Sequence, residues 1–233
     1  MDKNTIHAKL QATGIHLLFS LLLVLVGFAL LLMWYPAWLF WSDGGIQVLW
    51  LLVGVDLVLG PALTFVVYNP KKSIRERLLD LSLILIIQLA AFGYGMYQAY
   101  DQRSLTLWYD DTFGAVMSCP AQWYRKAGVP IPAVSATQLN QFRTDLSAQQ
   151  REQQMQLIQE QLAPCVLSDQ LMPFHAQKLT LPQPTVALNS LSSAQQSEIP
   201  KDRPLLVFSG RYQNVLLVLD QQDRVEKYYY LAK

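Results

Sequence analysis

Charge is scarce in this sequence, and the common catalytic motifs are absent from it. Only 15% of the 233 residues are charged, and the formal net charge is +1. Because Lys and Arg do not outnumber Asp and Glu enough to create a positive field, we expect no binding to nucleic acid. The chain holds no GxSxG, HExxH, GxGxxG or phosphate-binding-loop motif. Nothing in the sequence therefore favours an enzyme.

Cysteine is also rare. Cys119 and Cys165 are the two cysteines, and they have neither the CxxC spacing of redox proteins nor a Cys/His pattern for zinc. We therefore expect no metal and no cofactor. In an oxidising compartment the pair would form a structural disulfide that closes a loop of about 47 residues, which the chain-entropy model values at roughly 4 kcal/mol.

The shortage of charge is concentrated in the first hundred residues. Three windows there are long and apolar enough to cross a bilayer, at about residues 15–33, 46–68 and 79–100. The first run is too long for the apolar core of a signal peptide, so we expect an uncleaved helix. The predicted domains are a three-helix transmembrane domain, residues 1–100, and an exported α+β domain, residues 101–233.

A short basic connection sets the predicted topology. Asn69-Pro70 ends the second span, because proline lacks the N–H that would continue the helix. Four basic residues then crowd into one turn: Lys71, Lys72, Arg75 and Arg77. By the positive-inside rule this turn lies in the cytoplasm, together with the N-terminus and its Lys3 and Lys9. The domain after the third span is then expected in the periplasm.

The connection between the first two spans, residues 34–45, contains no Lys or Arg and is rich in aromatic side chains. We expect these side chains to form a belt at the far membrane interface, where an apolar ring and a polar edge both find a suitable medium. They are Trp34, Tyr35, Trp38, Phe40 and Trp41. Ser42 or Asp43 is expected to cap the second helix.

Asp56 is the most unusual residue of the spans, because an ionisable group near the bilayer centre costs several kcal/mol unless it is paired, neutral or hydrated. Gln88 of the third span falls at a similar depth, so a hydrogen bond between the two is expected. Asp56 is then a proton or ligand site, a contact for an incoming helix, or a packing contact worth about 0.6 to 2 kcal/mol. We favour packing or partner contact over proton transport, since no second central carboxylate or lysine accompanies it.

Small residues lie near Asp56 and in the third span. Gly60-Pro61 would loosen or kink the second helix, as a hinge or, in our preferred interpretation, as a packing notch. Gly93 and Gly95 make a small-residue surface that permits close approach of a helix, either from this chain or from a partner. His16 and Asp80 are expected to pair with each other or with lipid headgroups.

The α+β domain is predicted from shorter patterns. Residues 105–109 and 112–117 flank Asp110-Asp111 as a hairpin. Residues 135–163 are rich in Gln and carry one apolar helical stripe, which predicts a single helix. Two shorter helices are the alternative, because Ser147 with Gln150 repeats the capping-box pattern of Ser135 with Gln138.

The last sixty residues consist of a polar, Pro-rich segment followed by a segment with a clear β pattern. Residues 173–204 are expected to wrap the surface as a loop, with one helical turn near residues 192–198. Three runs of Val, Leu and Tyr then predict an antiparallel C-terminal β-meander. The runs are residues 205–209, 214–219 and 225–231.

Three stretches in this order carry a family resemblance: WYPAWLFWSDGG at 34–45, DLVLGPALTFVVYNPKK at 56–72, and RERLLDLS at the start of the third span. Over roughly residues 34–100 the chain resembles the TfpX/TfpZ family of type IV pilin accessory proteins. The resemblance implies a multi-pass protein of the bacterial inner membrane that associates with the major pilin. It also implies a chaperone-like role in pilin stability or pilus assembly, with the assembly machinery as a further partner.

On that hypothesis, intramembrane residues contact or orient the pilin helix, while the meander or the Gln-rich helix contacts the pilin head. The intramembrane candidates are Asp56, Gly60, Pro61, Gln88, Gly93 and Gly95. The alternative is a membrane-anchored sensor or receptor whose periplasmic domain binds a small ligand or an envelope component. A pilin-modifying enzyme is a third interpretation, for which the sequence offers no catalytic residue.

Overall fold

The structure is a computed structural model that describes residues 3–35, 37–131, 138–176, 179, 181 and 184–231. The chain divides into two compact units. The helical unit comprises Met1–Trp34 and Gly45–Tyr100, and the sheet unit comprises Tyr35–Gly44 and Asp101–Lys233. The segment between the first two long helices therefore belongs to the sheet unit, although the sequence analysis placed it within the first domain.

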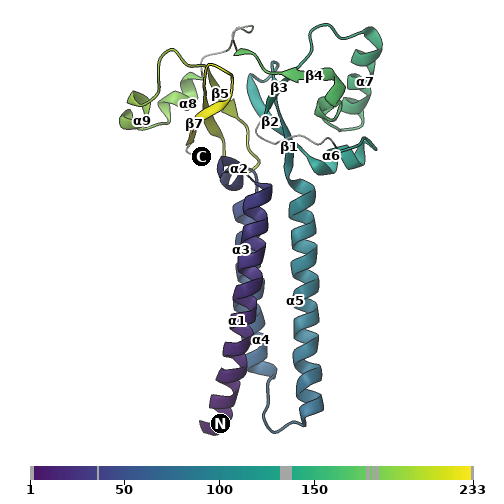
Figure 1. The fold of residues 1–233 in the computed structure, drawn as a ribbon, viewed down its shortest axis with the longest axis vertical. Coiled ribbons are helices and arrows are strands. Elements are labelled where there is room, and N and C mark those ends of the chain that lie inside the picture. Colours follow the sequence, from purple (N-terminus) through teal and green to yellow (C-terminus); the bar gives the residue numbers. More distant parts are fainter. Residues whose placement is uncertain are drawn as a thin grey trace. The chain divides into compact units, whose positions relative to one another are not determined.

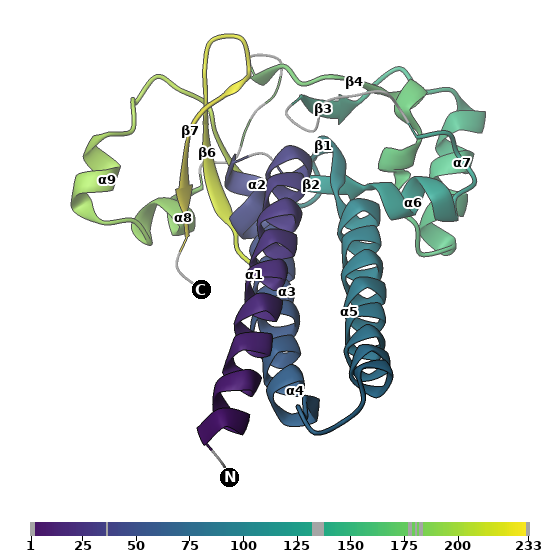
Figure 2. The same ribbon diagram turned by 60° about the horizontal axis from the view of Figure 1, so that its bottom comes forward.

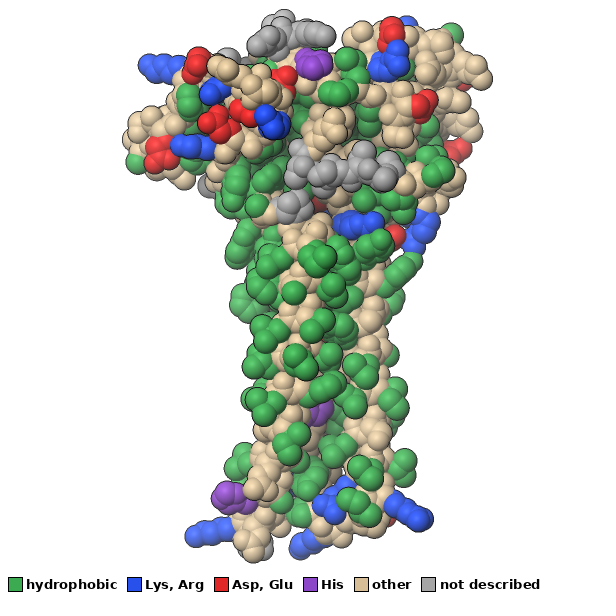
Figure 3. Space-filling view, viewed as in Figure 1, with side chains coloured by type: hydrophobic (Ala, Val, Ile, Leu, Met, Phe, Trp, Pro, Cys, Tyr) green, Lys and Arg blue, Asp and Glu red, His purple; other side chains and the backbone are tan. Residues whose placement is uncertain are grey.

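Three long apolar helices form the helical unit. The first has 32 residues, the second 23 and the third 29, and all are long and apolar enough to cross a membrane. The first and second helices lie side by side (Figures 1 and 2), and hydrophobic side chains cover the helices along their length (Figure 3). The elements are α1 (Lys3–Trp34), then α3 (Gly45–Leu52), η1 (Val53–Leu59) and α4 (Gly60–Val67) as one continuous helix, and α5 (Ile74–Gln102).

The N-terminus and the connection between α4 and α5 lie at the same end of the helical unit (Figure 1), and Lys or Arg side chains gather at that end (Figure 3). Lys9 donates from Nζ to the Phe65 and Val66 carbonyl oxygens at 3.0 and 3.2 Å, which satisfies backbone acceptors at the end of α4. Asp80 pairs with Lys72 at 2.6 Å. The expected pairing of Asp80 with His16 is therefore wrong, because Lys72 in the adjoining turn pairs with the carboxylate instead.

The other topology residues are more exposed. Lys71 and Arg75 project into open space, while Arg77 lies over the Tyr68 ring, 5.9 Å from its centroid. At the start of α5, Ser73 and Glu76 satisfy each other's backbone N–H groups. The start of α5 is therefore stabilised by contacts between residues of the turn itself.

A seven-stranded mixed sheet organises the second unit, in the order β4-β3-β1-β2-β5-β6-β7. The C-terminal antiparallel meander, β5-β6-β7, is confirmed. The parallel pairs β1-β3 and β2-β5 were not predicted, since they join segments far apart in the chain. The strands are β1 (Ser104–Asp110), β2 (Ala115–Pro120), β3 (Leu139–Phe142), β4 (Leu171–Pro173), β5 (Leu205–Phe208), β6 (Val215–Leu219) and β7 (Val225–Tyr230).

The predicted β1-β2 hairpin is present, but its second strand begins three residues later than expected. Asp110 Oδ1 accepts from the backbone N–H groups of Thr112 and Phe113, which holds those residues in the turn. Gly114 then adopts φ +62°, a conformation that glycine reaches without strain. A side-chain-stabilised turn therefore replaces the two-residue turn of the prediction.

Short helices lie at the two ends of the sheet, α6 and α7 beside β4-β3-β1 and α8 and α9 beside the meander (Figures 1 and 2). The turn near residues 192–198 was predicted, whereas the helix before it was not. The bounds are α6 (Ala121–Lys126), α7 (Ala148–Gln159), η2 (Pro164–Val166), η3 (Ser168–Gln170), α8 (Thr185–Asn189) and α9 (Ser193–Ser197).

A single helix over residues 135–163 is wrong. Leu139–Phe142 forms β3 instead, where Leu139 pairs beside Leu107 and the Phe142 ring lies 5.2 Å from that of Trp108. The second of the two alternative helices exists as α7, and Ser147 with Gln150 completes its capping box. Sheet pairing therefore overrides the helical stripe in the first half. Ser135, the expected first cap, lies outside the described residues.

The aromatic connection enters the core of the sheet unit through α2 (Ala37–Ser42). Tyr35, Trp38 and Phe40 are buried, and the Trp38 ring packs edge-on against Phe208 with centroids 4.7 Å apart. The predicted interfacial belt is therefore wrong for these three side chains. Trp41 is half exposed, and Trp34 packs against Tyr100 within the helical unit.

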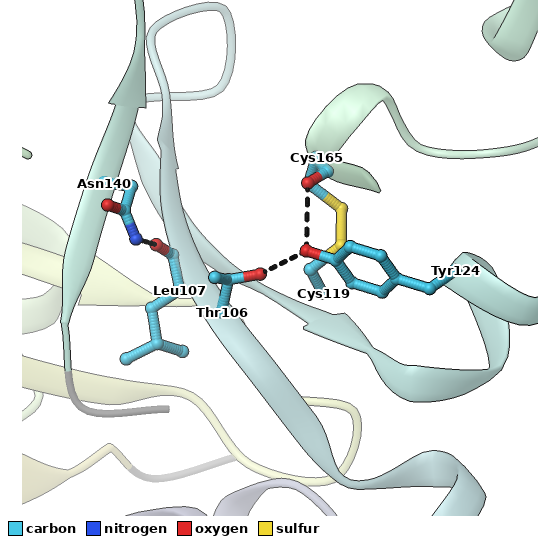
Figure 4. Close-up of a disulfide and its surroundings, with 6 residues drawn as sticks. All are labelled: Thr106, Leu107, Cys119, Tyr124, Asn140 and Cys165. Atoms are coloured by element: carbon cyan, nitrogen blue, oxygen red, sulfur yellow. Dashed lines mark hydrogen bonds between the residues drawn. A yellow bond between two sulfur atoms is a disulfide. The ribbon is translucent and has the colours of Figure 1, made fainter. Parts of the chain in front are cut away.

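The two cysteines are joined as a disulfide that ties β2 to η2 across 46 residues of sequence. Both are fully buried. The Tyr124 side chain points toward this disulfide (Figure 4). Its hydroxyl lies 2.8 Å from Thr106 Oγ1 and donates to the Cys165 carbonyl oxygen. Burial raises the pKa of Tyr124, so its phenol stays protonated and able to donate.

Candidate functional site

A chain of polar side chains links the three long helices inside the helical unit. Gln88 of α5 donates from Nε2 to the Asp56 backbone carbonyl oxygen at 3.5 Å. Its Oε1 lies 2.6 Å from Nε2 of His16 in α1, and Nδ1 of that ring lies 2.7 Å from Thr64 Oγ1 in α4. We call these four residues the polar network. The sequence placed Asp56 and Gln88 at one depth but missed His16 and Thr64.

Gly60 makes the network possible. A Cβ at this position would lie 1.9 Å from Gln88 Nε2 and 2.7 Å from Gln88 Cδ, so the amide occupies the space that a larger residue would fill. The sequence analysis read Gly60-Pro61 as a packing notch or a hinge. In the structure the notch is filled by this chain's own α5.

Asp56 lies in η1, a π-helical segment of seven residues. The Gly60 N–H bonds to the Val55 carbonyl oxygen, five residues back, and Pro61 follows without an N–H to restore the ordinary ladder. The Asp56 side chain is 1% exposed, and neither carboxylate oxygen has a hydrogen-bond partner among the described residues. The expected bond to Gln88 therefore reaches the Asp56 backbone and leaves its carboxyl group unpaired.

Gly93 and Gly95, the small residues of α5, lie in more open surroundings than Gly60 does. A Cβ at Gly93 or Gly95 would meet no atom within 4 Å in the described part of the chain. Of the three long helices, α5 is also the one least buried within the structure. Close packing inside this chain therefore does not account for these two glycines.

Replacing Gly60 by alanine is expected to displace the Gln88 amide and break the polar network. We expect a loss of about 1 to 3 kcal/mol, because small-to-large changes at a packed site have that effect. Gly93→Ala is the matched control, and it should leave stability unchanged or slightly raised, since alanine is the better helix former. Thermal unfolding in detergent measures both. Equal stability of the two variants would contradict the assignment of Gly60 to a filled notch.

An ion-pair cluster in the sheet unit fixes the segment 35–44. Arg211 donates from Nε to Asp43 Oδ1 at 2.9 Å and from Nη2 to the Gln102 carbonyl oxygen at 2.8 Å. Ser104 donates to the other Asp43 oxygen, and Tyr35 is hydrogen-bonded to Arg211. Burial raises the Tyr35 pKa to about 12, so this phenol is neutral beside the ion pair. We call this group the Arg211 latch.

No local sequence pattern indicates the latch, and Ser42 or Asp43 was expected to cap the second helix. That expectation is wrong. Asp43 is fully buried against Arg211, and the Ser42 hydroxyl donates to the Trp38 carbonyl oxygen within α2. Gly210 brings the facing loop close, since a Cβ there would lie 2.8 Å from the Ser42 carbonyl oxygen. Asp43 is a single acidic residue in a connection, and nothing in the neighbouring sequence indicates that its ion-pair partner is Arg211, 168 positions away.

The protein therefore belongs to the class that combines three apolar helices of membrane-spanning length with a disulfide-bonded sheet unit. The chain is similar to curated fimbrial assembly proteins of Dichelobacter nodosus, named for serogroup I, serogroups C1 and C2, and serogroup E1. Each is 37% identical over 108 residues, or 46% of this chain.

The matches cover different shares of those relatives. The matched region makes up 82% of the protein of serogroups C1 and C2, but only 42% of each of the other two. The chain therefore spans less than half the length of the relatives of serogroups I and E1. Since most of the C1 and C2 protein is matched, the chain belongs to this family of fimbrial assembly proteins. No family model and no solved structure matches the chain.

Proposed function

We propose that this protein is an inner-membrane accessory factor that binds the type IV pilin subunit and assists its assembly into pili. The observation that carries the proposal is the kinship with fimbrial assembly proteins. The resemblance of residues 34–100 to the TfpX/TfpZ family supports the same role and narrows it to pilin.

The helical unit suits a partner that is itself a membrane helix. Association of helices in lipid depends on close packing at small residues, because lipid tails offer no hydrophobic advantage. Among the described residues, none lies within 4 Å of a Cβ placed at Gly93 or Gly95 to account for these two glycines. In this proposal the surface of α5 that includes them receives the apolar helix of pilin, while the basic turn holds the N-terminus in the cytoplasm.

The sheet unit serves the exported part of pilin in this proposal. A disulfide and a buried ion pair stabilise the unit, and the disulfide is typical of an oxidising compartment such as the periplasm. The two elements predicted to contact the pilin head are α7 and the meander. Helix α7 carries exposed Met155 and Ile158, and β7 of the meander carries half-exposed Tyr228. Exposed apolar side chains of this kind are available to a protein partner.

Site-specific photocrosslinking in intact membranes tests the proposal. We expect pilin to be captured from positions in both units when the cells make pilin. Capture from neither unit would overturn the assignment of pilin as the partner.

A further inference from the structure

We propose that Asp56 is a reversible proton-binding site inside the helical unit, with its carboxyl group neutral at neutral pH. This inference goes beyond the proposed role in pilus assembly and does not depend on it. It begins from the two Asp56 oxygens, which are buried and lack any hydrogen-bond partner among the described residues. An isolated carboxylate removed from water is one of the most costly groups in a folded protein, whereas a protonated carboxyl avoids most of that cost.

The polar network contacts Asp56 through its backbone carbonyl oxygen and not through its carboxyl group. The Gln88 nitrogen is committed to the Asp56 carbonyl oxygen, so the Gln88 oxygen faces His16 and accepts from Nε2–H. Thr64 can then donate its hydroxyl to Nδ1. Both ring nitrogens of His16 thus have a hydrogen-bond partner within the network. In the proposal, the proton that neutralises the site lies on Asp56, whose two carboxyl oxygens have no partner among the described residues.

The other elements packed against η1 bring no further charge to Asp56. His16 of α1 is the titratable group close enough to act on the carboxyl electrostatically. On α1, Lys9 is bound to carbonyl oxygens at the end of α4. Helices α3 and α4 contain no Asp, Glu, His, Lys or Arg. From α5 the nearest carboxylate in sequence, Asp80, is already paired with Lys72.

Release of the proton would change the packing of α5. A charged carboxylate attracts amide donors, and Gln88 Nε2 is already bound to the backbone carbonyl oxygen of Asp56 itself. If that amide turns to the carboxylate, its bond with His16 is lost, because one side chain makes both contacts. The site therefore couples one proton to the link between α5 and the other two helices.

Infrared spectroscopy of the full chain in lipid nanodiscs tests this site. We expect a protonated carboxyl C=O band at neutral pH that disappears on alkaline titration. The band should vanish in Asp56→Asn, which preserves the shape of the side chain, and persist in Asp80→Asn, the matched control on α5. It should also persist in His16→Gln, because this change removes the imidazole and leaves the Asp56 carboxyl group in place.

Three outcomes would overturn the proposal. They are the absence of a protonated carboxyl band at neutral pH, a band that survives in Asp56→Asn, and a band lost in His16→Gln when near-ultraviolet circular dichroism shows a native fold. Pilin capture is measured separately in membranes. Failure of the proton site would leave the pilin proposal standing, and failure of pilin capture would leave the infrared result unchanged.

Discussion

Arg211→Ala is expected to destabilise the sheet unit by about 3 to 5 kcal/mol, because it leaves the fully buried Asp43 carboxylate without its cation. Asp43 is fully buried, and Arg211 supplies both its ion pair and a bond to its backbone carbonyl oxygen. The alanine variant would keep the bond from the Ser104 hydroxyl to that carboxylate but lose the cation. Urea unfolding followed by tryptophan fluorescence measures the loss.

The matched control is Arg224→Ala. That guanidinium is largely exposed and lies 3.5 Å from Asp220, so its removal should change stability by less than about 1 kcal/mol. Arg211→Lys should fall between the two, because it keeps the charge but loses the planar fork that reaches Asp43 and Gln102 together. Similar unfolding midpoints for Arg211→Ala and Arg224→Ala would contradict the role assigned to the latch.

Removing the disulfide is the second change with a large expected effect. The double variant Cys119→Ala and Cys165→Ala should lose roughly 4 kcal/mol, since the cross-link no longer restricts a long loop in the unfolded chain. Both sulfur atoms are buried, so the surrounding packing adds to the loss. Urea unfolding with and without reductant measures the effect.

The wild-type protein provides the control for the disulfide. Reductant should lower its stability toward that of the double variant and leave the double variant unchanged. Alkylation of the unreduced protein in cells should modify neither cysteine. Modification of both would contradict the disulfide and would also count against the periplasmic location of the sheet unit, because disulfides are rare in the cytosol.

Local patterns in the sequence were enough to predict the three long helices and the C-terminal meander. An apolar run of bilayer length with at most one charged residue defines a helix without reference to other segments, and the runs of Val, Leu and Tyr before Tyr230 define strands in the same way. The Asn69-Pro70 break and the Ser147 capping box were likewise readable, because each involves residues only a few positions apart.

Features that depend on distant contacts could not be predicted. Leu139–Phe142 carries a helical stripe, yet pairing with β1 makes it a strand. Trp38 and Tyr35 match an interfacial belt in composition, but the sheet unit supplies an apolar core that buries them more completely. Asp43 forms its ion pair with Arg211, and no pattern in the neighbouring residues indicates a partner so far away in the chain.

The candidate site was predicted in part. A carboxyl group and an amide at equal depth suggested that Asp56 and Gln88 meet, and their contact exists through the Asp56 backbone. The π-helical turn that hides the carboxyl group has no sequence signature beyond the neighbouring Gly60-Pro61. His16 was assigned to the membrane boundary because its partners, Gln88 and Thr64, lie on two other helices.

The central claim, that the protein holds membrane-resident pilin through both units, is tested most directly by photocrosslinking in intact membranes. Leu63 in α4 and Tyr212 beside the meander are suitable positions, because both side chains are partly exposed. Cells that lack pilin serve as the control, and mass spectrometry identifies each adduct. The account predicts pilin adducts from both positions that disappear in the control cells. Adducts only to lipid or to this protein itself, in cells that make pilin, would contradict it.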